Sequence, residues 1–285
     1  MFRRNRFTNT TFKPMTNSCD PKLKPSPYQS LSLHLKQLKL SHMLTQWETL
    51  EHQAVQEGWS YAQFLLALCE LEAQRRWQVR LQRALVEAQL PSGKTLSNFD
   101  WAHIPTLNPA PLMQLADDPG WITRAENLLL FGASGVGKTH LAVGVSRRMV
   151  ELGKRVKFFS ALALVQHLQQ AKLQLQLQLM LKKLDRFDLL LIDDIGYVKK
   201  SEAETSVLFE LIAHRYERRS VIITANQPFS QWDAIFTDSM MTVAAVDRLV
   251  HHAVIIEIQS QSYRQQSALS KSANPHPAEA PESAC

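Results

Sequence analysis

With 285 residues, the chain is long enough for one well-formed core and a smaller second unit, but not for many domains. Apolar residues make up 45% of it and charged residues 20%, a composition that excludes an intrinsically disordered protein and is typical of a soluble globular one. No run approaches the roughly 18 to 20 apolar residues of a membrane-spanning helix, so no membrane partner is expected. The net charge of +6 and the pI of about 9.3 indicate an acidic partner, of which nucleic acid is the commonest.

Cysteine and histidine spacing predicts neither a disulfide framework nor a zinc site. Cys19, Cys69 and Cys285 are far apart, which suits a reducing, cytoplasmic location. His251 and His252 are adjacent, and neighbours on a helix cannot share one face as ligands at i and i+4 would. We therefore interpret the histidines as ordinary surface or core residues.

The first 30 residues are expected to form a disordered basic arm with a single acid, Asp20. Such an arm either follows nucleic-acid phosphates or is simply solvated. Its composition also mimics an organelle transit peptide, although no cleavable apolar segment follows, and Met15 is an alternative start.

Residues 31–90 are predicted to form a small helical N-terminal domain that binds DNA or a protein partner. Apolar side chains recur at three-to-four spacing from Leu31 to about Ala54, the signature of an amphipathic helix. A second helix begins at a capping box formed by Ser60 and Gln63.

Four arginines on this second helix have two interpretations. They either line a solvated face or form a phosphate-contacting stripe, and composition alone favours the solvated face. They are Arg75, Arg76, Arg80 and Arg83.

Five prolines and glycines between residues 91 and 111 interrupt any periodicity and indicate a linker. After it, short apolar runs alternate with helical stretches, as in a parallel sheet covered by helices. A capping box at Ser201 and Glu204 marks the helix before the fourth run. The five predicted strands are Asn127 to Phe131, Arg155 to Ser160, Asp188 to Asp193, Ser220 to Ala225 and Val254 to Gln259.

Two segments are read from composition. Leu173 to Leu181 alternates Leu and Gln, which formally predicts a strand, but both residues favour helices and we expect a helix there. Residues 266–285 are predicted to be a disordered tail.

Residues 132–139 satisfy the pattern G-x-x-x-x-G-K-[ST] between a predicted strand and a helix, the context that a phosphate-binding loop requires. Glycines let successive backbone N–H groups point at phosphate oxygens, Lys138 adds a positive charge, and Thr139 offers a hydroxyl to Mg²⁺. The positive end of the following helix dipole faces the same anion. We therefore expect ATP and Mg²⁺ as ligands. The loop comprises Gly132, Ala133, Ser134, Gly135, Val136, Gly137, Lys138 and Thr139.

Polar residues end two of the predicted strands. Asp193 and Asp194 follow a very apolar strand, at the edge where open α/β sheets bind ligands. We expect Asp193 to hold Mg²⁺ and Asp194 to orient or deprotonate the attacking water. Asn226 follows the next strand and either contacts that water or the terminal phosphate, as a sensor 1 residue does, or is an ordinary turn residue.

As a set, these segments resemble the IstB family over residues 31–265. The resemblance rests on Phe99, Asp100 and Trp101 and on the stretches LLLFGASGVGKTHLA, FDLLLIDDIGY, VIITANQPF and VDRLVHHA. The family consists of AAA+ ATPases that assist the transposase of bacterial insertion sequences and are related to the DnaC replicative helicase loader. It implies an α/β AAA+ P-loop NTPase domain over residues 112–265 with a five-stranded parallel sheet.

The resemblance also implies roles for residues outside the phosphate-binding loop. Arg248 matches the family's arginine finger, which reaches the nucleotide of a neighbouring subunit, and Arg264 corresponds to a sensor 2 arginine. Asp194 departs from the wider AAA+ pattern, in which Glu is commonest, and the shorter side chain is expected to slow hydrolysis.

These features predict a slow, DNA-stimulated ATPase that oligomerises on double-stranded DNA and assists a transposase encoded by a neighbouring reading frame. A loader whose partner is the replicative helicase is the near alternative. A small-molecule phosphotransferase would need a closing lid that the sequence does not contain. A nucleotide-gated DNA-binding module with negligible hydrolysis also fits the sequence.

Overall fold

The computed structural model describes residues 26–196, 201–228, 231–232, 239–260 and 262–263. The chain consists of two compact units, and the boundary between them in the sequence falls between Trp77 and Gln78. The predicted basic arm as far as residue 25 and the predicted tail from residue 266 lie outside the described residues, whereas residues 27–30, expected to belong to the disordered arm, are helical. Within the described ranges, no helix is long and apolar enough to cross a membrane.

The first unit is helical. It contains α1 (Pro27–Gln37), α2 (Ser41–Glu57) and the first part of α3 (Tyr61–Ala88). The predicted capping box is confirmed, because Gln63 N–H donates to Ser60 Oγ over 3.3 Å and Ser60 N–H donates to Gln63 Oε1 over 2.8 Å. A small apolar core holds the three helices together, and its buried members are Leu35, Met43, Trp47 and Leu68.

Glu72 joins α3 to the start of α2 within this unit. Its Oε2 accepts hydrogen bonds from the backbone N–H groups of His42 (2.8 Å) and Met43 (3.2 Å), and its Oε1 accepts one from Arg76 Nε (2.8 Å). Burial by itself raises the pKa of Glu72, but these hydrogen bonds outweigh it, so the pKa lies below its usual value. Arg76 also donates to Lys39 O over 3.0 Å, which makes it part of the helical packing.

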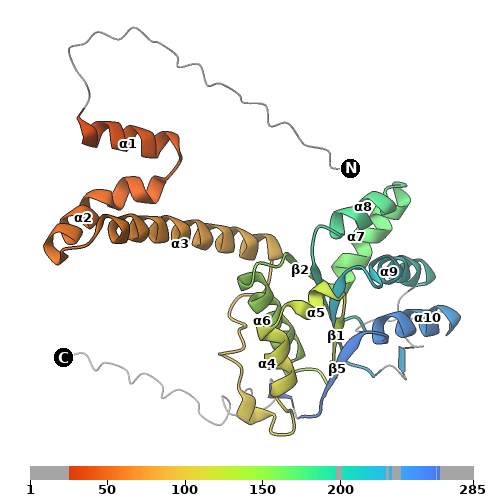
Figure 1. Cartoon of the computed structure of the whole chain (residues 1–285). Coiled ribbons are helices and arrows are strands. Elements are labelled where there is room, and N and C mark those ends of the chain that lie inside the picture. The colour runs from red at the N-terminus through yellow and green to blue at the C-terminus, as the bar shows by residue number, and fades with distance from the viewer. Residues whose placement is uncertain (1–25, 197–200, 229–230, 233–238, 261, 264–285) are drawn as a thin grey trace, which may run out of the picture. The chain divides into compact units, whose positions relative to one another are not determined.

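The second unit is built on a parallel sheet with the strand order β2-β3-β4-β1-β5 (Figure 1). All five predicted strands are confirmed, with bounds that differ from the prediction by at most one residue. They are β1 (Asn127–Gly132), β2 (Val156–Ser160), β3 (Leu189–Asp193), β4 (Ser220–Ala225) and β5 (Ala253–Ile258).

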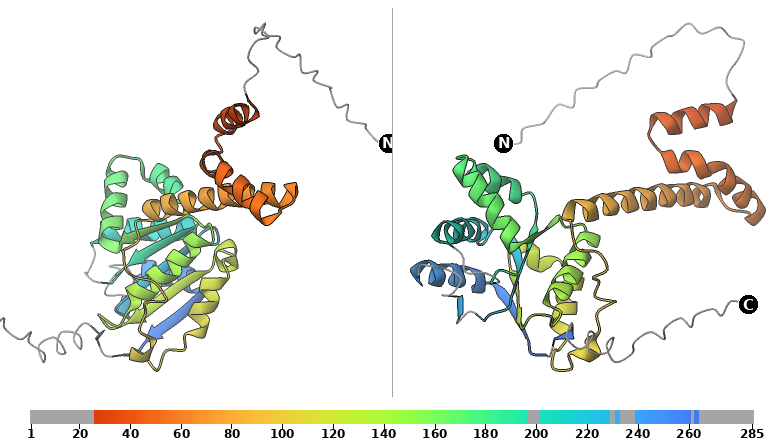
Figure 2. Two further views of the ribbon diagram at one scale, coloured as in Figure 1. Left: turned by 90° about the vertical axis from the view of Figure 1, so that its left-hand side faces the viewer. Right: turned by 180° about the vertical axis from the view of Figure 1, so that it is seen from behind.

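Helices cover both faces of this sheet (Figure 2). Side chains of β1 alternate between the two cores: Leu128 and Leu130 pack on one face, and Leu129 and Phe131 on the other. The first face carries α4 (Ala110–Asp117), α5 (Gly120–Thr123) and α6 (Lys138–Glu151), and the second carries α7 (Ala161–Leu173), α8 (Leu177–Leu184), α9 (Glu202–Arg215) and α10 (Ser239–Val250).

The segment with alternating Leu and Gln is helical, as expected, apart from a turn at residues 174–176 that separates α7 from α8. Leu177, Leu181 and Leu184 are buried at helical spacing, whereas Leu175 is 96% exposed. Within α8, Leu177 and Leu181 face the core and Leu179 between them is exposed, so the segment packs with the four-residue spacing of a helix rather than the two-residue spacing of a strand.

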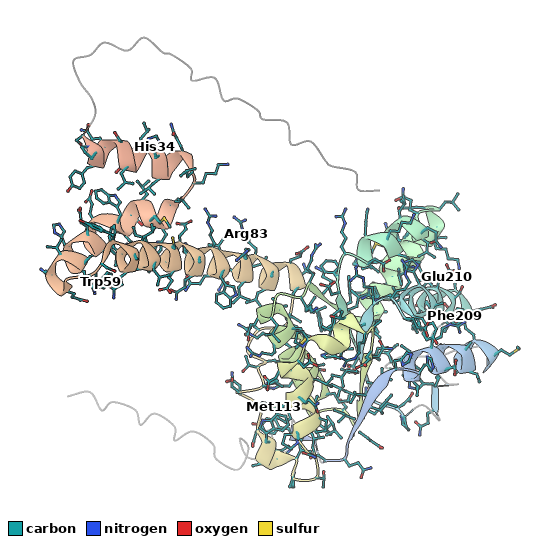
Figure 3. The ribbon with its side chains drawn as sticks, viewed as in Figure 1. His34, Trp59, Arg83, Met113, Phe209 and Glu210 are labelled. Carbon is teal, nitrogen blue, oxygen red and sulfur yellow. The ribbon has the colours of Figure 1, made fainter. Side chains whose placement is uncertain are left out.

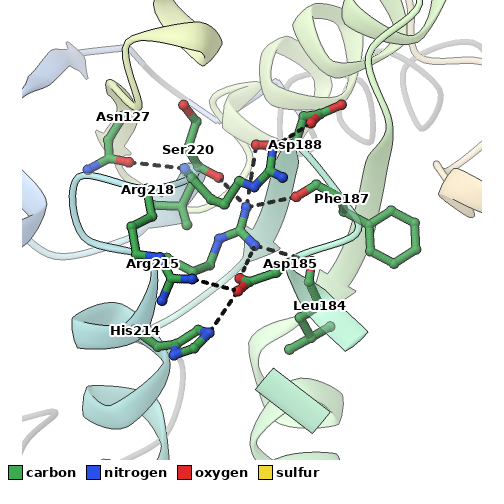
Figure 4. A network of polar contacts seen from close by, with 11 residues as sticks. Asn127, Leu184, Asp185, Phe187, Asp188, His214, Arg215, Arg218 and Ser220 are labelled. Atoms are coloured by element: carbon green, nitrogen blue, oxygen red, sulfur yellow. Dashed lines mark hydrogen bonds and ion pairs between the residues drawn. The ribbon is translucent and has the colours of Figure 1, made fainter. Parts of the chain in front are cut away.

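A buried arginine fixes the amino-terminal edge of the sheet (Figure 4). The Arg215 guanidinium donates to the backbone oxygens of Leu184 (3.2 Å), Phe187 (3.1 Å) and Ser220 (3.0 Å). Burial lowers the pKa of Arg215 to about 9, and nearby Asp185 opposes that shift, so the group stays charged at neutral pH. This network lies at the opposite ends of β3 and β4 from the acidic pair.

Candidate nucleotide-binding site

Residues 133–137 form a tight loop between β1 and α6. Gly135 (φ 85°) and Gly137 (φ 100°) adopt left-handed backbone angles that L side chains rarely adopt. Gly137 also has no room for a side chain, because a Cβ atom there would lie 2.8 Å from Cε2 of Phe99. The loop conformation thus depends on glycine for both its angles and its close packing.

The ammonium of Lys138 is fixed at the mouth of this loop. It donates to Gly132 O (2.8 Å), Ala133 O (2.7 Å) and Asn226 Oδ1 (2.7 Å), and Lys138 is only 5% exposed. Asn226 follows β4, so this contact joins the loop to the neighbouring strand. Both predicted site residues therefore lie at one point on the carboxyl edge of the sheet.

Asp193 lies beside Thr139 at the same edge. Its Oδ1 accepts a hydrogen bond from Thr139 Oγ1 over 2.8 Å and another from Thr224 Oγ1 over 2.6 Å. A hydroxyl and a carboxylate are the oxygen ligands that Mg²⁺ takes beside a nucleotide. The donor set present fits that cation.

Asp194 has an unusual backbone conformation for a residue with a side chain. Its φ is 61°, and its N–H donates to Thr224 Oγ1 over 2.9 Å. The next residue, Ile195, is fully buried and donates to Thr224 O over 3.0 Å. A left-handed non-glycine residue costs of order 1 kcal/mol and is often found at functional sites.

A cavity of about 250 Å³ opens in front of the loop. Its wall includes residues 134–140, Asp194 and Asn226, so the predicted phosphate end and the predicted catalytic groups border one space. The rest of the wall comes from elsewhere in the chain: Lys94, Asn98, Phe99, Asp100, His103, Ile104 and Tyr263.

The aromatic side of the cavity is held by contacts with the loop itself. Phe99 packs edge-on against His140 with ring centroids 5.2 Å apart, and His103 packs edge-on against Tyr263 at 4.9 Å. The backbone N–H of Tyr263 donates to Gly135 O over 3.2 Å. Nε2 of His103 is buried and has no hydrogen-bond partner among the described residues. This wall suits a flat heteroaromatic group with a polar edge.

The predicted arginines do not join this cavity in the described structure. Arg248 lies on α10, donates to Ala244 O over 2.7 Å, and stacks over the ring of Phe209 of α9 at 5.2 Å. Phe209 is labelled in Figure 3. Arg248 lines a separate open hollow beside Tyr216 and Met240. Arg264 lies outside the described residues.

Sequence reasoning missed Thr224 and most of the aromatic wall. From the sequence, Thr224 is predicted only to lie in a strand. Its position beside Asp193 follows from the pairing of β3 with β4. Residues 94–104 belonged to a segment interpreted as a linker. The available signal was Phe99, Asp100 and Trp101, an aromatic group within a proline-rich break.

Comparison with known proteins agrees with this geometry. A family model described as IstB-like ATP binding protein matches residues 33–271, which is most of the chain. The chain belongs to this family. A Sinorhizobium fredii protein named for ATP binding in an insertion sequence is 49% identical over 84% of this chain and 80% of its own length. One from Pseudomonas aeruginosa, named for insertion sequence IS21, is 35% identical over 82% of this chain and 88% of its own.

Solved structures show the same AAA+ P-loop fold. AMPPCP-bound DnaA from Aquifex aeolicus aligns with a TM-score of 0.51 and 19% identity, over 68% of this chain and 58% of that one. A DNA replication initiation factor also aligns with a TM-score of 0.51, at 18% identity, over 65% of this chain and 55% of that one. The predicted α/β class, with its five-stranded parallel sheet and helical N-terminal region, is confirmed.

Proposed function

We propose that this chain binds and hydrolyses ATP with Mg²⁺, and that it assembles on double-stranded DNA to assist a transposase. The observation that carries the ATPase proposal is the convergence of Lys138, Thr139 and Asn226 on one cavity, with Asp193 hydrogen-bonded to Thr139. These four residues come from three elements, and together they supply one cation, two oxygen ligands and one amide.

Each group has a distinct role in this proposal. Backbone N–H groups of residues 133–138 and the Lys138 ammonium bind the phosphates, while Thr139 and Asp193 hold Mg²⁺. The bound cation neutralises charge on the phosphate oxygens. The Asp194 carboxylate orients the attacking water and accepts its proton, and Asn226 contacts the terminal phosphate.

The aromatic wall extends the proposal to the base of the nucleotide. Phe99, Ile104 and Tyr263 provide apolar surface in the wall of the cavity, against which a flat base can pack. The His103 ring, packed edge-on against Tyr263, adds to this surface.

We infer that Arg248 acts on the site of a neighbouring copy rather than on its own. Its guanidinium lies on the Phe209 ring beside the open hollow and does not line the cavity of its own subunit. An arginine supplied in trans stabilises the transition-state charge and contributes of order 10³ to 10⁵ in rate.

The names of the similar proteins favour a transposase over a helicase as the partner, because these relatives are named for insertion sequences. The exposed basic residues of α3 support DNA binding, together with a net charge of +6.

The purified full chain tests this proposal. ATP binding with and without Mg²⁺, phosphate release with and without duplex DNA, and co-sedimentation with the transposase of the adjacent reading frame are measured separately. We expect Mg²⁺-dependent binding, turnover raised by DNA, and a ternary complex. Absence of nucleotide binding contradicts the site, binding without turnover supports a nucleotide-gated module, and capture of a helicase instead supports a loader.

A further inference from the structure

Two turns of the second unit bring together three metal-ligating side chains far from the nucleotide cavity. Glu217 follows α9, and His251 and His252 lie in the turn between α10 and β5. One ligand atom of each residue lies within 4.8 Å of the other two. Adjacent histidines on a helix would point to different faces, but His251 and His252 lie in a turn and their ring centroids are 4.0 Å apart.

From this arrangement, we propose that Glu217, His251 and His252 bind a divalent transition metal ion of the Zn²⁺ class. Glu217 Oε1 lies 3.8 Å from Nδ1 of His251 and 3.9 Å from Nε2 of His252. Tetrahedral Zn²⁺ with bonds of about 2.0 to 2.1 Å separates its ligand atoms by roughly 3.4 Å. The two separations from Glu217 therefore exceed the tetrahedral value by only about half an ångström, and all three ligand atoms lie within 4.8 Å of one another.

The backbone under this cluster is already fixed. The buried side chain of Asn127 accepts from Val221 N–H over 3.0 Å and donates to Leu249 O over 3.1 Å, so it ties β4 to the end of α10. Its backbone N–H donates to His252 O over 2.7 Å. The turn that carries Glu217 is held by N–H groups of the next two residues, both donating to Arg215 O over 2.9 Å. Such anchoring lowers the entropic cost of assembling a metal site.

The two arginines that follow Glu217 in sequence leave its carboxylate available for a cation. The guanidinium groups of Arg218 and Arg219 contact Asp185 (3.5 Å) and Asp188 (2.7 Å) instead. On the neighbouring turn of α10, the exposed carboxylate of Asp247 and the guanidinium of Arg248 act on Tyr216 with opposite signs. Two imidazoles and one carboxylate prefer Zn²⁺ or its transition-metal neighbours to Mg²⁺ or Ca²⁺, which take oxygen ligands. This set would leave a fourth position for water.

Tyr216 modulates the proposed site. Its hydroxyl lies 2.8 Å from Nδ1 of His251, so it competes with a metal ion for that nitrogen. Removal of the hydroxyl should therefore strengthen metal binding, a result that a merely structural role for the cluster would not produce. The bound ion would also join the end of α9 to the end of α10, which carries Arg248.

Calorimetric titration of the metal-stripped full chain with ZnCl₂ tests this site. Excess MgCl₂ is present throughout, so that oxygen-lined sites are not counted. We expect one Zn²⁺ per chain, at least a tenfold loss of affinity in Glu217→Gln and in His252→Ala, and a gain in Tyr216→Phe. The matched control is His52→Ala, which removes an exposed histidine of the first unit and should leave the titration unchanged.

Because His252 and Glu217 are about half exposed, both variants should keep the wild-type melting temperature in the absence of metal. As a second measurement, Co²⁺ in place of Zn²⁺ should give visible absorption bands that are lost in His252→Ala. Failure of the wild-type chain to bind Zn²⁺, or an equal affinity in wild type and both ligand variants, would overturn the proposal. Neither result depends on ATP, so the proposed ATPase function is tested independently.

Discussion

Thr139 donates a hydrogen bond to Asp193 over 2.8 Å although the two residues lie 54 positions apart in the sequence. The same carboxylate oxygen accepts a second hydroxyl, that of Thr224, over 2.6 Å. The proposed Mg²⁺ ligands are therefore positioned by three elements, α6, β3 and β4, before any cation enters. This arrangement makes the contribution of Thr224 measurable.

Thr224→Val should weaken binding of Mg²⁺-ATP about tenfold, because the hydroxyl that orients both acids is lost and a hydrogen bond to a charged group contributes about 1.5 kcal/mol or more. Binding of ATP in the presence of a chelator should change little. Fluorescence titration of both forms measures the difference. Thr224→Ser should keep the wild-type affinity. If Thr224→Val loses ATP affinity equally with and without Mg²⁺, the Thr224 hydroxyl supports the fold and not the Mg²⁺ ligands.

Lys138→Ala should reduce ATP affinity at least tenfold and abolish turnover. The Lys138 residue is 5% exposed and its ammonium is held by three oxygen acceptors at the loop, so its loss removes a fixed positive charge beside the phosphates. Lys182→Ala serves as the matched control, since that lysine is exposed on α8. Unchanged phosphate release in Lys138→Ala, at wild-type melting temperature, would remove the site assignment.

Arg248→Ala should keep ATP affinity and lose DNA-stimulated turnover by a factor of order 10³. We expect the loss because the guanidinium lies outside the cavity of its own subunit, so only an assembled form can use it. Mixing an excess of Lys138→Ala chains with Arg248→Ala chains tests action in trans, because the first supplies the arginine and the second the intact loop. If the mixture shows no more DNA-stimulated ATP turnover than either variant alone, Arg248 does not act between subunits.

Local patterns predicted the sheet and the phosphate-binding loop because each depends on a short stretch of sequence. The strand bounds follow from apolar runs, and the loop at 132–139 follows from glycine spacing. The role of Thr224 could not be found in this way, because β4 lies beside β3 only after the sheet has formed. The same is true of Phe99, whose packing on Gly137 joins a proline-rich segment to the loop.

Double substitution of Arg80 and Arg83 with Gln should weaken binding to duplex DNA and flatten its salt dependence. The two side chains lie on one face of α3 at i and i+3 spacing, and both are exposed. Figure 3 labels Arg83 on this helix. For each DNA phosphate that the variant no longer neutralises, the slope of log K against log salt should become shallower by about 0.9. Arg186→Gln, in an exposed turn after α8, is the matched control. An unaltered slope in the double variant would mean that Arg80 and Arg83 are exposed to solvent and contact no DNA phosphate.

Arg76, the third arginine of that face, should behave differently because its guanidinium already donates hydrogen bonds to Glu72 and to Lys39 O. Arg76→Gln is expected to loosen the helical unit rather than weaken the attraction to a DNA phosphate. Its effect on DNA binding should therefore follow the loss of stability, with no separate change in salt slope.

Glu72→Gln should destabilise the helical unit by about 1 kcal/mol at neutral pH, because the carboxylate accepts the first backbone N–H groups of α2. The lowered pKa of Glu72 fixes the sign of the pH dependence. Its stabilisation is fully present above the unfolded pKa of about 4.5 and is lost as the pH falls through the lower folded value, since the unfolded chain binds more protons there.

Hydrogen exchange in residues 41–57, expressed as protection factors, measures this effect between pH 7 and pH 3. The difference between wild type and Glu72→Gln should shrink at the acid end, while Glu70→Gln, an exposed neighbour, should show no difference at any pH. A constant difference across the range would mean that Glu72 acts through packing, because a carboxylate that acts through its charge must lose its advantage once both states are protonated.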